Sequence, residues 1–464
     1  MKTIYAISFD GVPLSGITVE FLKIANIFNN HGYKIYLDLG YDIKADKNNF
    51  FHRYTQTDRL FFPEWITLTR IEGLDKIAGY NQVFVSDFFE ELFASNKPIQ
   101  TLHLNEKIIE TISNLILNTW RQLEINFVIV ENGTLPENIH FTKALLIAID
   151  KYGKEKKLGK YVFWRDHDLM WSSETTKKKY GHSPYPETPQ PINSSFIQNI
   201  VLHTADYEKT KEWIPNSAPA IISNSFCYNE KRRSQTNSDF RDHYNIPHDA
   251  LLLSRYTRII PQKRIDRDIH LLASLIRLFK QNHLDKEIYL FVVGNLNEDI
   301  HETQRLLSMI RELNIEDYII FENGLLPYNH HLFFPPTCVS EQKQYSINDL
   351  LACTDLACFL TSYDYESYGN PIGEAVAAKV PYATTTYSRY HHVYGSKGLQ
   401  GILLTINKNN DHMTIINDEF VNAVFELLSD KNKQKNIIQN NYQIAKKHFS
   451  LATLERKIKL LFNL

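Results

Sequence analysis

From Asp355 to Val380 the chain reads DLACFLTSYDYESYGNPIGEAVAAKV. Its short apolar run, residues 356–361, is typical of a buried strand, and the polar and aromatic letters that follow indicate a loop. A helix is predicted after the loop, with Asn370 as its N-cap and Pro371 in its first position. The stretch therefore predicts a strand, loop and helix of an α/β domain.

Two glutamates, Glu366 and Glu374, lie eight residues apart within this stretch. The N–H groups of the first helical residues lack intrahelical partners, so those of Ile372, Gly373 and Glu374 are predicted donors to an anion. Gly369 and Gly373 would let a ligand approach the backbone. Glu374, expected in the first turn, could then accept from sugar hydroxyls, with Glu366 facing the same crevice. The alternative is that Glu374 complements the helix dipole and Glu366 is solvated.

The composition indicates a globular chain of two or three domains. It has 464 residues, of which 43% are apolar and 12% aromatic, which is enough for sizeable cores. The formal charge of −2 gives no overall field for nucleic acid, so we expect no nucleic-acid partner. The four cysteines show no CxxC spacing, which fits a reducing compartment. The apolar run at the N-terminus is too short for the hydrophobic region of a signal peptide. We therefore expect a cytoplasmic protein.

The N-terminal half predicts a doubly wound α/β domain, because residues 3–39 read as strand, loop, helix and strand. Ser15 and Gly16, at the expected helix start, are candidate phosphate contacts, with an ordinary tight turn as the alternative. Further elements are predicted along this half: strands at 81–86, 99–104 and 127–131, and a helix at 106–123.

Clustered aromatics at residues 47–70 interrupt this rhythm. Three interpretations stay open: an acceptor platform, a membrane-docking surface at the inner membrane face, or a loop folded onto the core, which the composition of cores favours. Peripheral membrane contact is thus left open by the sequence.

The segment YVFWRDHDLMW, residues 161–171, reads as a strand that ends in polar residues. His167 there is a candidate to hydrogen-bond a substrate hydroxyl, or else it caps its neighbours. Asp166 and Asp168 flank it and could be read as a metal-binding Asp-x-Asp pair. Because no second cluster of ligands supports that reading, we expect no metal site.

A second α/β domain is predicted to restart with a strand at 250–255. Arg258 and Lys263 follow it, five residues apart, with Arg264 and Arg267 close by. On a solvated loop such cations mean little, but at the carboxyl end of a strand they would clamp a diphosphate. The predicted organisation is a first domain over 1–228, a linker over 229–248, a second domain over 249–440, and C-terminal helices over 441–464 that pack back toward the first domain.

Together these motifs resemble the retaining glycosyltransferases of GT-B fold, family 4, which include trehalose-synthase-like and bacterial hexosyltransferase members. ESYGNPIGE resembles the family's Glu-x7-Glu element, and Arg258 with Lys263 resembles its Arg-x4-Lys clamp. The Ser-Gly loop resembles its Gly-Gly loop, and VFWRDHD resembles its Trp-Arg-x-His strand end. The chain departs at Ser15, at Thr257 and at Ser367-Tyr368, where glycine, glycine and Gly-Phe are usual.

The resemblance implies a GT-B architecture: two doubly wound Rossmann-like domains facing each other across a cleft, with C-terminal helices that cross back to the first domain. It implies transfer of a hexose from a nucleotide-diphosphate sugar, with UDP favoured over GDP, to an acceptor, and no cofactor or metal. Glu374 would hold the ribose, Glu366 the donor hexose, and Arg258 with Lys263 the diphosphate. The residues with implied catalytic roles are Glu366, His167, Arg258 and Lys263. Those with implied donor contacts are Ser15, Gly16, Arg258, Lys263, Glu366, Ser367, Tyr368, Gly369, Asn370, Pro371 and Glu374.

Two alternatives remain beside transfer. A nucleotide-sugar 2-epimerase shares the two-domain fold and would turn over the donor without an acceptor. A catalytically silent binding or scaffold protein would bind nucleotide without turnover.

Overall fold

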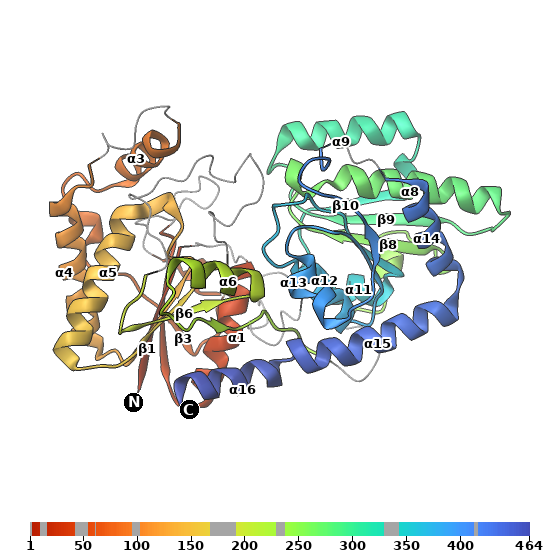
Figure 1. The fold of residues 1–464 in the computed structure, drawn as a ribbon. Coiled ribbons are helices and arrows are strands. Elements are labelled where there is room, and N and C mark those ends of the chain that lie inside the picture. The colour runs from red at the N-terminus through yellow and green to blue at the C-terminus, as the bar shows by residue number, and fades with distance from the viewer. Residues whose placement is uncertain are drawn as a thin grey trace. The chain divides into compact units, whose positions relative to one another are not determined.

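A computed structural model describes residues 2–9, 16–41, 54–60, 62–94, 103–167, 192–228, 237–328, 343–412 and 416–464 (Figure 1). The chain divides into two compact units. The first runs to Ser223 and also takes in Leu454–Leu464, and the second begins at Asn224 and ends at Thr453. No helix among the described residues combines the length and apolar character needed to cross a membrane.

The first unit is built on a parallel sheet of seven described strands in the order β3-β2-β1-β4-β5-β6-β7. Every residue of β1 is buried, as expected for a strand covered on both faces. The strand order reverses between β1 and β4, and in open α/β sheets ligands bind at the carboxyl ends of strands beside such a reversal. The strands are β1 Thr3–Ser8, β2 Lys34–Leu39, β3 Ile66–Leu68, β4 Phe127–Glu131, β5 Val162–Arg165, β6 Ile197–Val201 and β7 Ala220–Ile221.

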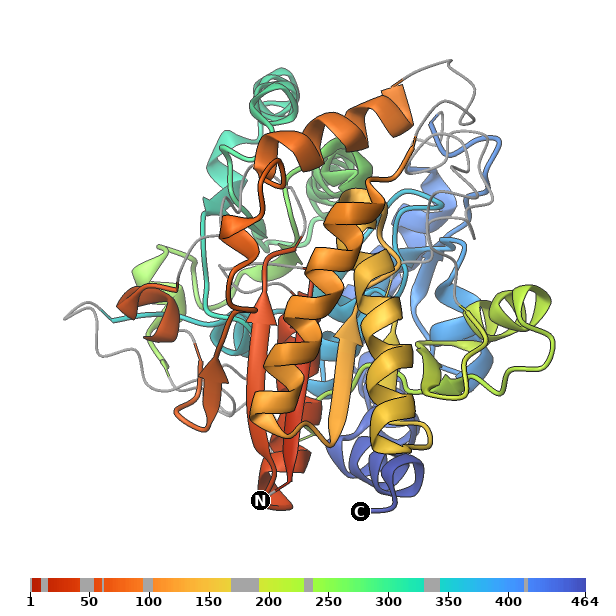
Figure 2. The same ribbon diagram turned by 90° about the vertical axis from the view of Figure 1, so that its left-hand side faces the viewer.

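Helices cover this sheet, and α4 and α5 lie side by side across one face (Figure 2). The helices are α1 Gly16–Asn30, α2 Gln56–Leu60, α3 Gln82–Ala94, α4 Glu106–Leu123, α5 Ile139–Lys156 and α6 Thr204–Trp213, together with most of α16 Leu451–Phe462. Phe462 of α16 stacks on Phe163 with ring centroids 3.4 Å apart and meets Phe28 edge-on. The last helix of the chain thus completes the core of the first unit, as predicted for helices that return to it.

Two predicted strands of the first unit are wrong or fall partly outside the described residues. The run at 81–86 opens helix α3, because the Asn81 side chain caps it by accepting from the N–H of Phe84 at 2.9 Å. Three consecutive apolar residues are too few to separate a strand from a helix. Of the run at 99–104, the described residues 103 and 104 form no strand. Of the aromatic segment 47–70, residues 47–53 and 61 lie outside the described residues, while Phe62 is buried.

The second unit also has a parallel sheet, with six described strands in the order β10-β9-β8-β11-β12-β13. The reversal here lies between β8 and β11. The strands are β8 Leu251–Tyr256, β9 Ile288–Val293, β10 Ile319–Glu322, β11 Leu356–Phe359, β12 Tyr382–Thr385 and β13 Ile402–Leu404. The helices are α7 Phe240–His243, α8 Ile265–Gln281, α9 Ile300–Leu313, α11 Ile347–Cys353, α12 Asn370–Ala377, α13 Tyr390–Val393, α14 Asp418–Ser429 and α15 Lys431–Phe449.

Residues 237–248, the described part of the expected linker, belong to the second unit. Phe240 of α7 is fully buried against Phe291 and Tyr345. Arg241 donates hydrogen bonds to the carbonyls of Pro247, Ala250 and Cys353. The polar composition that suggested a linker therefore includes a buried anchor, which a count of charged residues does not reveal.

We expect His140 to make the first unit sensitive to acid. Its ring is buried edge-on to Phe84 and Phe88 and accepts a hydrogen bond from the N–H of Asn105 at 3.1 Å. Burial lowers the pKa of His140 to about 4, whereas an unfolded histidine titrates near 6.5. The stabilisation from the neutral ring is therefore complete above about pH 6.5 and is lost as pH falls toward 4, by roughly 2 to 3 kcal/mol.

Tryptophan fluorescence during urea unfolding measures this effect, since all five tryptophans precede Ser223 and report on the first unit. His140→Gln keeps an acceptor for Asn105 without a charge change, so its unfolding midpoint should fall less between pH 7 and pH 4. His301→Gln, at an exposed site of α9, is the control and should follow the wild type. Equal acid slopes in all three proteins would remove this role from His140.

Candidate active site

The candidate site of the second unit lies at the carboxyl edge of its sheet, where β8 and β11 are neighbours. Arg258 and Lys263 follow β8, and Glu366 follows β11. A parallel sheet brings the loops after adjacent strands together, so residues about 100 positions apart in sequence meet at one edge. Both halves of the predicted clamp and the first predicted glutamate are at this reversal point.

Lys263 and Glu366 form a direct ion pair between Nζ and Oε1. Their side chains are 11% and 12% exposed, so a ligand could reach both. Burial lowers the pKa of the Lys263 ammonium, and the Glu366 carboxylate opposes that shift. The Nζ atom also lies 5.0 Å from the centre of the Tyr365 ring. The site thus holds a desolvated cation whose present partner is a carboxylate.

Arg258, the other predicted cation, has a side chain that is 54% exposed and pairs with Glu298 after β9. Its charge is close enough to lower the pKa of Lys263. Two positively charged side chains are therefore held close together, and each is paired with a glutamate. This is the arrangement of charges at the predicted clamp, and its contact with a diphosphate stays a prediction.

Two buried arginines support the loops that carry these residues. Arg255 is fully buried and donates to the carbonyl of Lys263 and, at 3.0 Å, to Oγ1 of Thr257. Its NH1 lies 3.5 Å from the carboxylate of Asp268, which is equally buried. Arg267 donates to the carbonyl of Thr361 at 2.8 Å, just after β11. These side chains fix the backbone on both sides of the reversal point.

Asp268 is a buried carboxyl group with an unusual environment. Neither of its oxygens has a hydrogen-bond partner among the described residues. Burial raises its pKa to about 7, against the opposing charge of Arg255.

Arg264 is also engaged within the protein, by Asp266 at 3.1 Å. All four cations of the sequence cluster are thus engaged by protein groups. A diphosphate contact through Arg258 and Lys263 stays a prediction.

The start of α12 differs from the prediction. The helix begins at Asn370, and Gly369 is its N-cap with φ 84°. Glu374 is therefore beyond the first turn, which contains no acidic residue. The N–H of Ile372 donates to the carbonyl of Gly369 at 3.1 Å, and Pro371 has no N–H. The helix start thus offers fewer free N–H donors to an anion than the sequence predicted.

Internal packing explains both glycines of this segment. A Cβ on Gly373 would lie 2.1 Å from the ring of Phe226, and one on Gly369 would lie 2.4 Å from Oη of Tyr387. The spaces that the sequence assigned to a ligand are therefore filled by protein side chains. A ligand contact through Gly369 stays a prediction.

The remaining predicted donor contacts belong to the same loop and helix start. Tyr368 is buried, with its hydroxyl donating to the Asn224 carbonyl at 3.3 Å. The carbonyl of Pro371 accepts from the Tyr256 hydroxyl at 2.7 Å, which joins the end of β8 to α12. Ser367 lies between Glu366 and Tyr368. Asn370 accepts at its side-chain oxygen from the Asn224 amide at 2.8 Å.

Glu374 is half-buried on α12, where its charge raises the pKa of the tyrosines at 256 and 394. Burial is the larger cause of both shifts. Because Tyr256 ends β8, Glu374 belongs to the same edge of the sheet as the cations that follow β8. This placement supports the prediction that both glutamates serve one site.

The first unit holds a buried charged cluster at the carboxyl ends of β4 and β5. The Glu131 Oε2 atom accepts from Nε of Arg165 at 2.9 Å and lies 2.8 Å from Nε2 of His167. The N–H of His167 donates to the side chain of Asn132 at 2.7 Å. Glu131 Oε1 and Arg165 NH2 are buried without hydrogen-bond partners among the described residues. His167 thus contacts its own strand-end neighbours, and a bond to substrate stays a prediction.

Asp166 faces the protein interior, since it accepts from the hydroxyl of Thr134 at 2.7 Å. Burial raises its pKa to about 7. Asp168 and Ser15 lie outside the described residues, while Gly16 is the exposed first residue of α1. Within the described part of the chain, no group of three His, Cys, Asp or Glu side chains could hold a metal ion.

Sequence reasoning missed Arg255, Asp268 and Glu298. A charged residue within an apolar strand, as Arg255 is in LLLSRY, was the available signal for the first. Asp268, on the first turn of α8, reads like an ordinary residue that complements the helix dipole. Glu298 lies in a polar loop, and its pairing with Arg258 depends on the fold alone.

No protein-family model and no curated protein sequence matches this chain. Solved structures do match in fold. A glycosyltransferase from Rickettsia africae is 13% identical with a TM-score of 0.60, over 99% of this chain and 98% of that one. Sucrose-phosphate synthase from Thermosynechococcus elongatus is 12% identical with a TM-score of 0.59, over 100% and 98%. HepE from Anabaena, solved with UDP and glucose, is 15% identical with a TM-score of 0.56, over 100% of both chains. The chain has the GT-B fold of these glycosyltransferases along its whole length.

Proposed function

We propose that this protein is a retaining GT-B hexosyltransferase, similar to family 4, that uses a nucleotide-diphosphate sugar. The observation that carries the proposal is the Lys263–Glu366 pair beside Arg258 at the reversal point of the second sheet. In this pair a cation suited to binding phosphate contacts a carboxylate suited to binding sugar hydroxyls. The fold of glycosyltransferases along the whole chain supports the same reading, and the UDP in HepE favours a UDP-linked donor.

In the proposed reaction the bond between the sugar C1 and the β-phosphate oxygen breaks, and a bond from C1 to the acceptor oxygen forms on the same face. The acceptor proton passes to the leaving phosphate. Negative charge grows on that phosphate, and preorganised cations lower the barrier where the charge develops. Lys263 and Arg258 would supply those cations, and Glu366 would orient the hexose. No nucleophilic side chain is required.

A thermal-shift panel of UDP, GDP, ADP and their sugars tests the donor. A ligand that binds only the folded protein raises its apparent stability. We expect the largest shift from UDP and UDP-hexoses. Release of UDP that requires an added acceptor supports transfer, whereas donor turnover without an acceptor would point to epimerisation. No shift with any nucleotide would overturn the proposal.

Glu374→Ala is expected to weaken nucleoside diphosphate binding by about tenfold, the scale of a hydrogen bond to a charged group. Folding should change little, because alanine is a strong helix former at this half-buried position of α12. Calorimetry with UDP measures the affinity. Glu426→Ala, at an exposed helical glutamate of α14, is the matched control. An unchanged UDP affinity in Glu374→Ala would remove the ribose role from this residue.

A further inference from the structure

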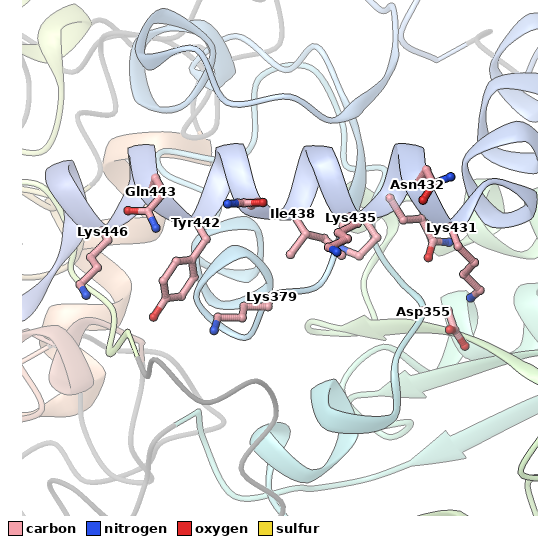
Figure 3. A pocket seen from close by; sticks show the side chains of 12 residues that line it. Asp355, Lys379, Lys431, Asn432, Lys435, Ile438, Tyr442, Gln443 and Lys446 are labelled. Atoms are coloured by element: carbon pink, nitrogen blue, oxygen red, sulfur yellow. The ribbon is translucent and has the colours of Figure 1, made fainter.

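A recess of the second unit lies beneath helix α15, at the amino edge of the sheet (Figure 3). Its volume is about 980 Å³. Asp355 and Pro381, which immediately precede β11 and β12, line it. The candidate active site is at the opposite, carboxyl edge, so the strands separate the two by roughly 13 to 20 Å. We call this recess the α15 groove.

The α15 groove carries a strong local positive charge on a chain of nearly balanced charge. Four lysines line it and only one acidic residue, Asp355. That carboxylate is already engaged, since it accepts from the N–H of Leu252 at 3.0 Å and lies 3.7 Å from Arg241. The lining lysines are Lys379, Lys431, Lys435 and Lys446.

The sequence of α15 places this charge against the preferences of a helix. It has five lysines and no acidic residue over 19 positions, so no pair within the helix balances them. Lys431 and Lys433 are in the first turn, where the helix dipole disfavours cations. Lys431, Lys435, Tyr442 and Lys446 follow a helical spacing, and Figure 3 shows them along the side of α15 that faces the groove. The stripe spans about 22 Å at 1.5 Å per residue.

One amide in the wall of the α15 groove lacks a partner. Gln434 is 7% exposed, and its Nε2 is buried with no acceptor among the described residues. Because this atom is closed off from solvent, a ligand in the groove would meet the exposed amides of the wall instead. Gln439, Gln443 and Asn432 also line the groove. Amide groups among lysines suit a ligand that carries both hydroxyls and acidic groups.

We propose that the α15 groove binds an elongated acidic glycan, with its anionic groups on the lysines and its hydroxyls on the amides. The length of the stripe exceeds what one phosphate could bridge. Nucleic acid fits less well, because the single aromatic in the lining, Tyr442, is buried beneath Lys379 and offers no face for base stacking. A membrane surface fits less well, because the recess is concave and Ile438 is its one large aliphatic side chain.

Fluorescence anisotropy of the full chain with a labelled hyaluronan dodecasaccharide tests the site. The variant Lys431→Gln/Lys435→Gln should bind about two- to thirtyfold more weakly, the range that two exposed ion pairs allow. The control Lys433→Gln/Lys447→Gln removes the same charge from α15 at positions that do not line the groove, and should bind like the wild type. Glutamine preserves helix propensity in both. Affinity of the wild type should fall with added salt.

The comparison probes are a maltodextrin of equal length, single-stranded DNA and vesicles of phosphatidylglycerol. We expect no binding of the neutral glycan and weaker binding of the other two. The proposal is overturned by a wild type that does not bind hyaluronan at low salt, by equal weakening in both variants, or by tighter binding to DNA or vesicles. The assay needs no turnover, so its result is independent of the proposed transfer reaction. UDP affinity should be the same in all variants.

Discussion

Lys263→Ala is expected to lower the rate of sugar transfer by about 100-fold or more, the scale seen when a preorganised transition-state donor is removed. Lys263 is nearly buried and is paired with Glu366, so water replaces its charge poorly. The leaving phosphate would then develop its charge without the nearest cation. Steady-state release of UDP with a saturating acceptor measures the effect, and Lys280→Ala, at an exposed site of α8, is the matched control.

Variants of Arg258 and of its partner Glu298 test the clamp by two opposite effects, a loss of transfer and a gain of UDP binding. Arg258→Ala should also lower transfer by about 100-fold. Glu298→Gln removes the carboxylate that pairs with Arg258 and should tighten UDP binding by up to about fivefold, because exposed ion pairs are worth about 0.2–1 kcal/mol. Near-normal transfer in both alanine variants would sink the clamp assignment. Unchanged UDP binding in Glu298→Gln would show only that Arg258 binds no diphosphate.

Arg255→Leu is expected to destabilise the second unit by about 3–5 kcal/mol, since it leaves Asp268 as an unpaired buried charge. The loss should depend on pH. The pKa of Asp268 is raised to about 7 in the folded protein. The stability contributed by its neutral form is therefore fully present below the unfolded pKa near 4 and is lost as pH rises through 7. The variant should therefore suffer more at pH 8 than at pH 5.5.

Far-UV circular dichroism during urea unfolding measures that loss, while tryptophan fluorescence, confined to the first unit, serves as an internal reference. The double variant Arg255→Leu/Asp268→Leu should recover most of the stability, because an apolar pair can replace a buried ion pair. It should still bind UDP weakly, since the brace on the Lys263 carbonyl is missing. Full recovery of UDP affinity would reduce Arg255 to a purely structural residue.

Much of the fold could be read from the chain because parallel strands covered on both faces are continuous apolar runs. The strands predicted at 3–9, 127–131 and 250–255 are present in the structure at Thr3–Ser8, Phe127–Glu131 and Leu251–Tyr256. The strand predicted at 81–86 is a helix because its capping residue, Asn81, outweighs three consecutive apolar side chains. A long apolar pattern therefore identifies a strand or helix by itself, whereas a short pattern can be overridden by a capping residue.

The sequence by itself determined that Arg258, Lys263 and Glu366 come together at the carboxyl edge of the second sheet, because neighbouring parallel strands must end there together. Only the tertiary structure decided how they pair. It placed Lys263 on Glu366 and Arg258 on Glu298, and it put the Phe226 ring where a ligand was expected beside Gly373. It also brought α15 over the amino edge of the sheet to form a basic groove. The periodicity of apolar residues is a local property, so it predicts where helices and strands form. The pairing and burial of side chains depend on contacts between segments about a hundred residues apart, which the local pattern does not contain.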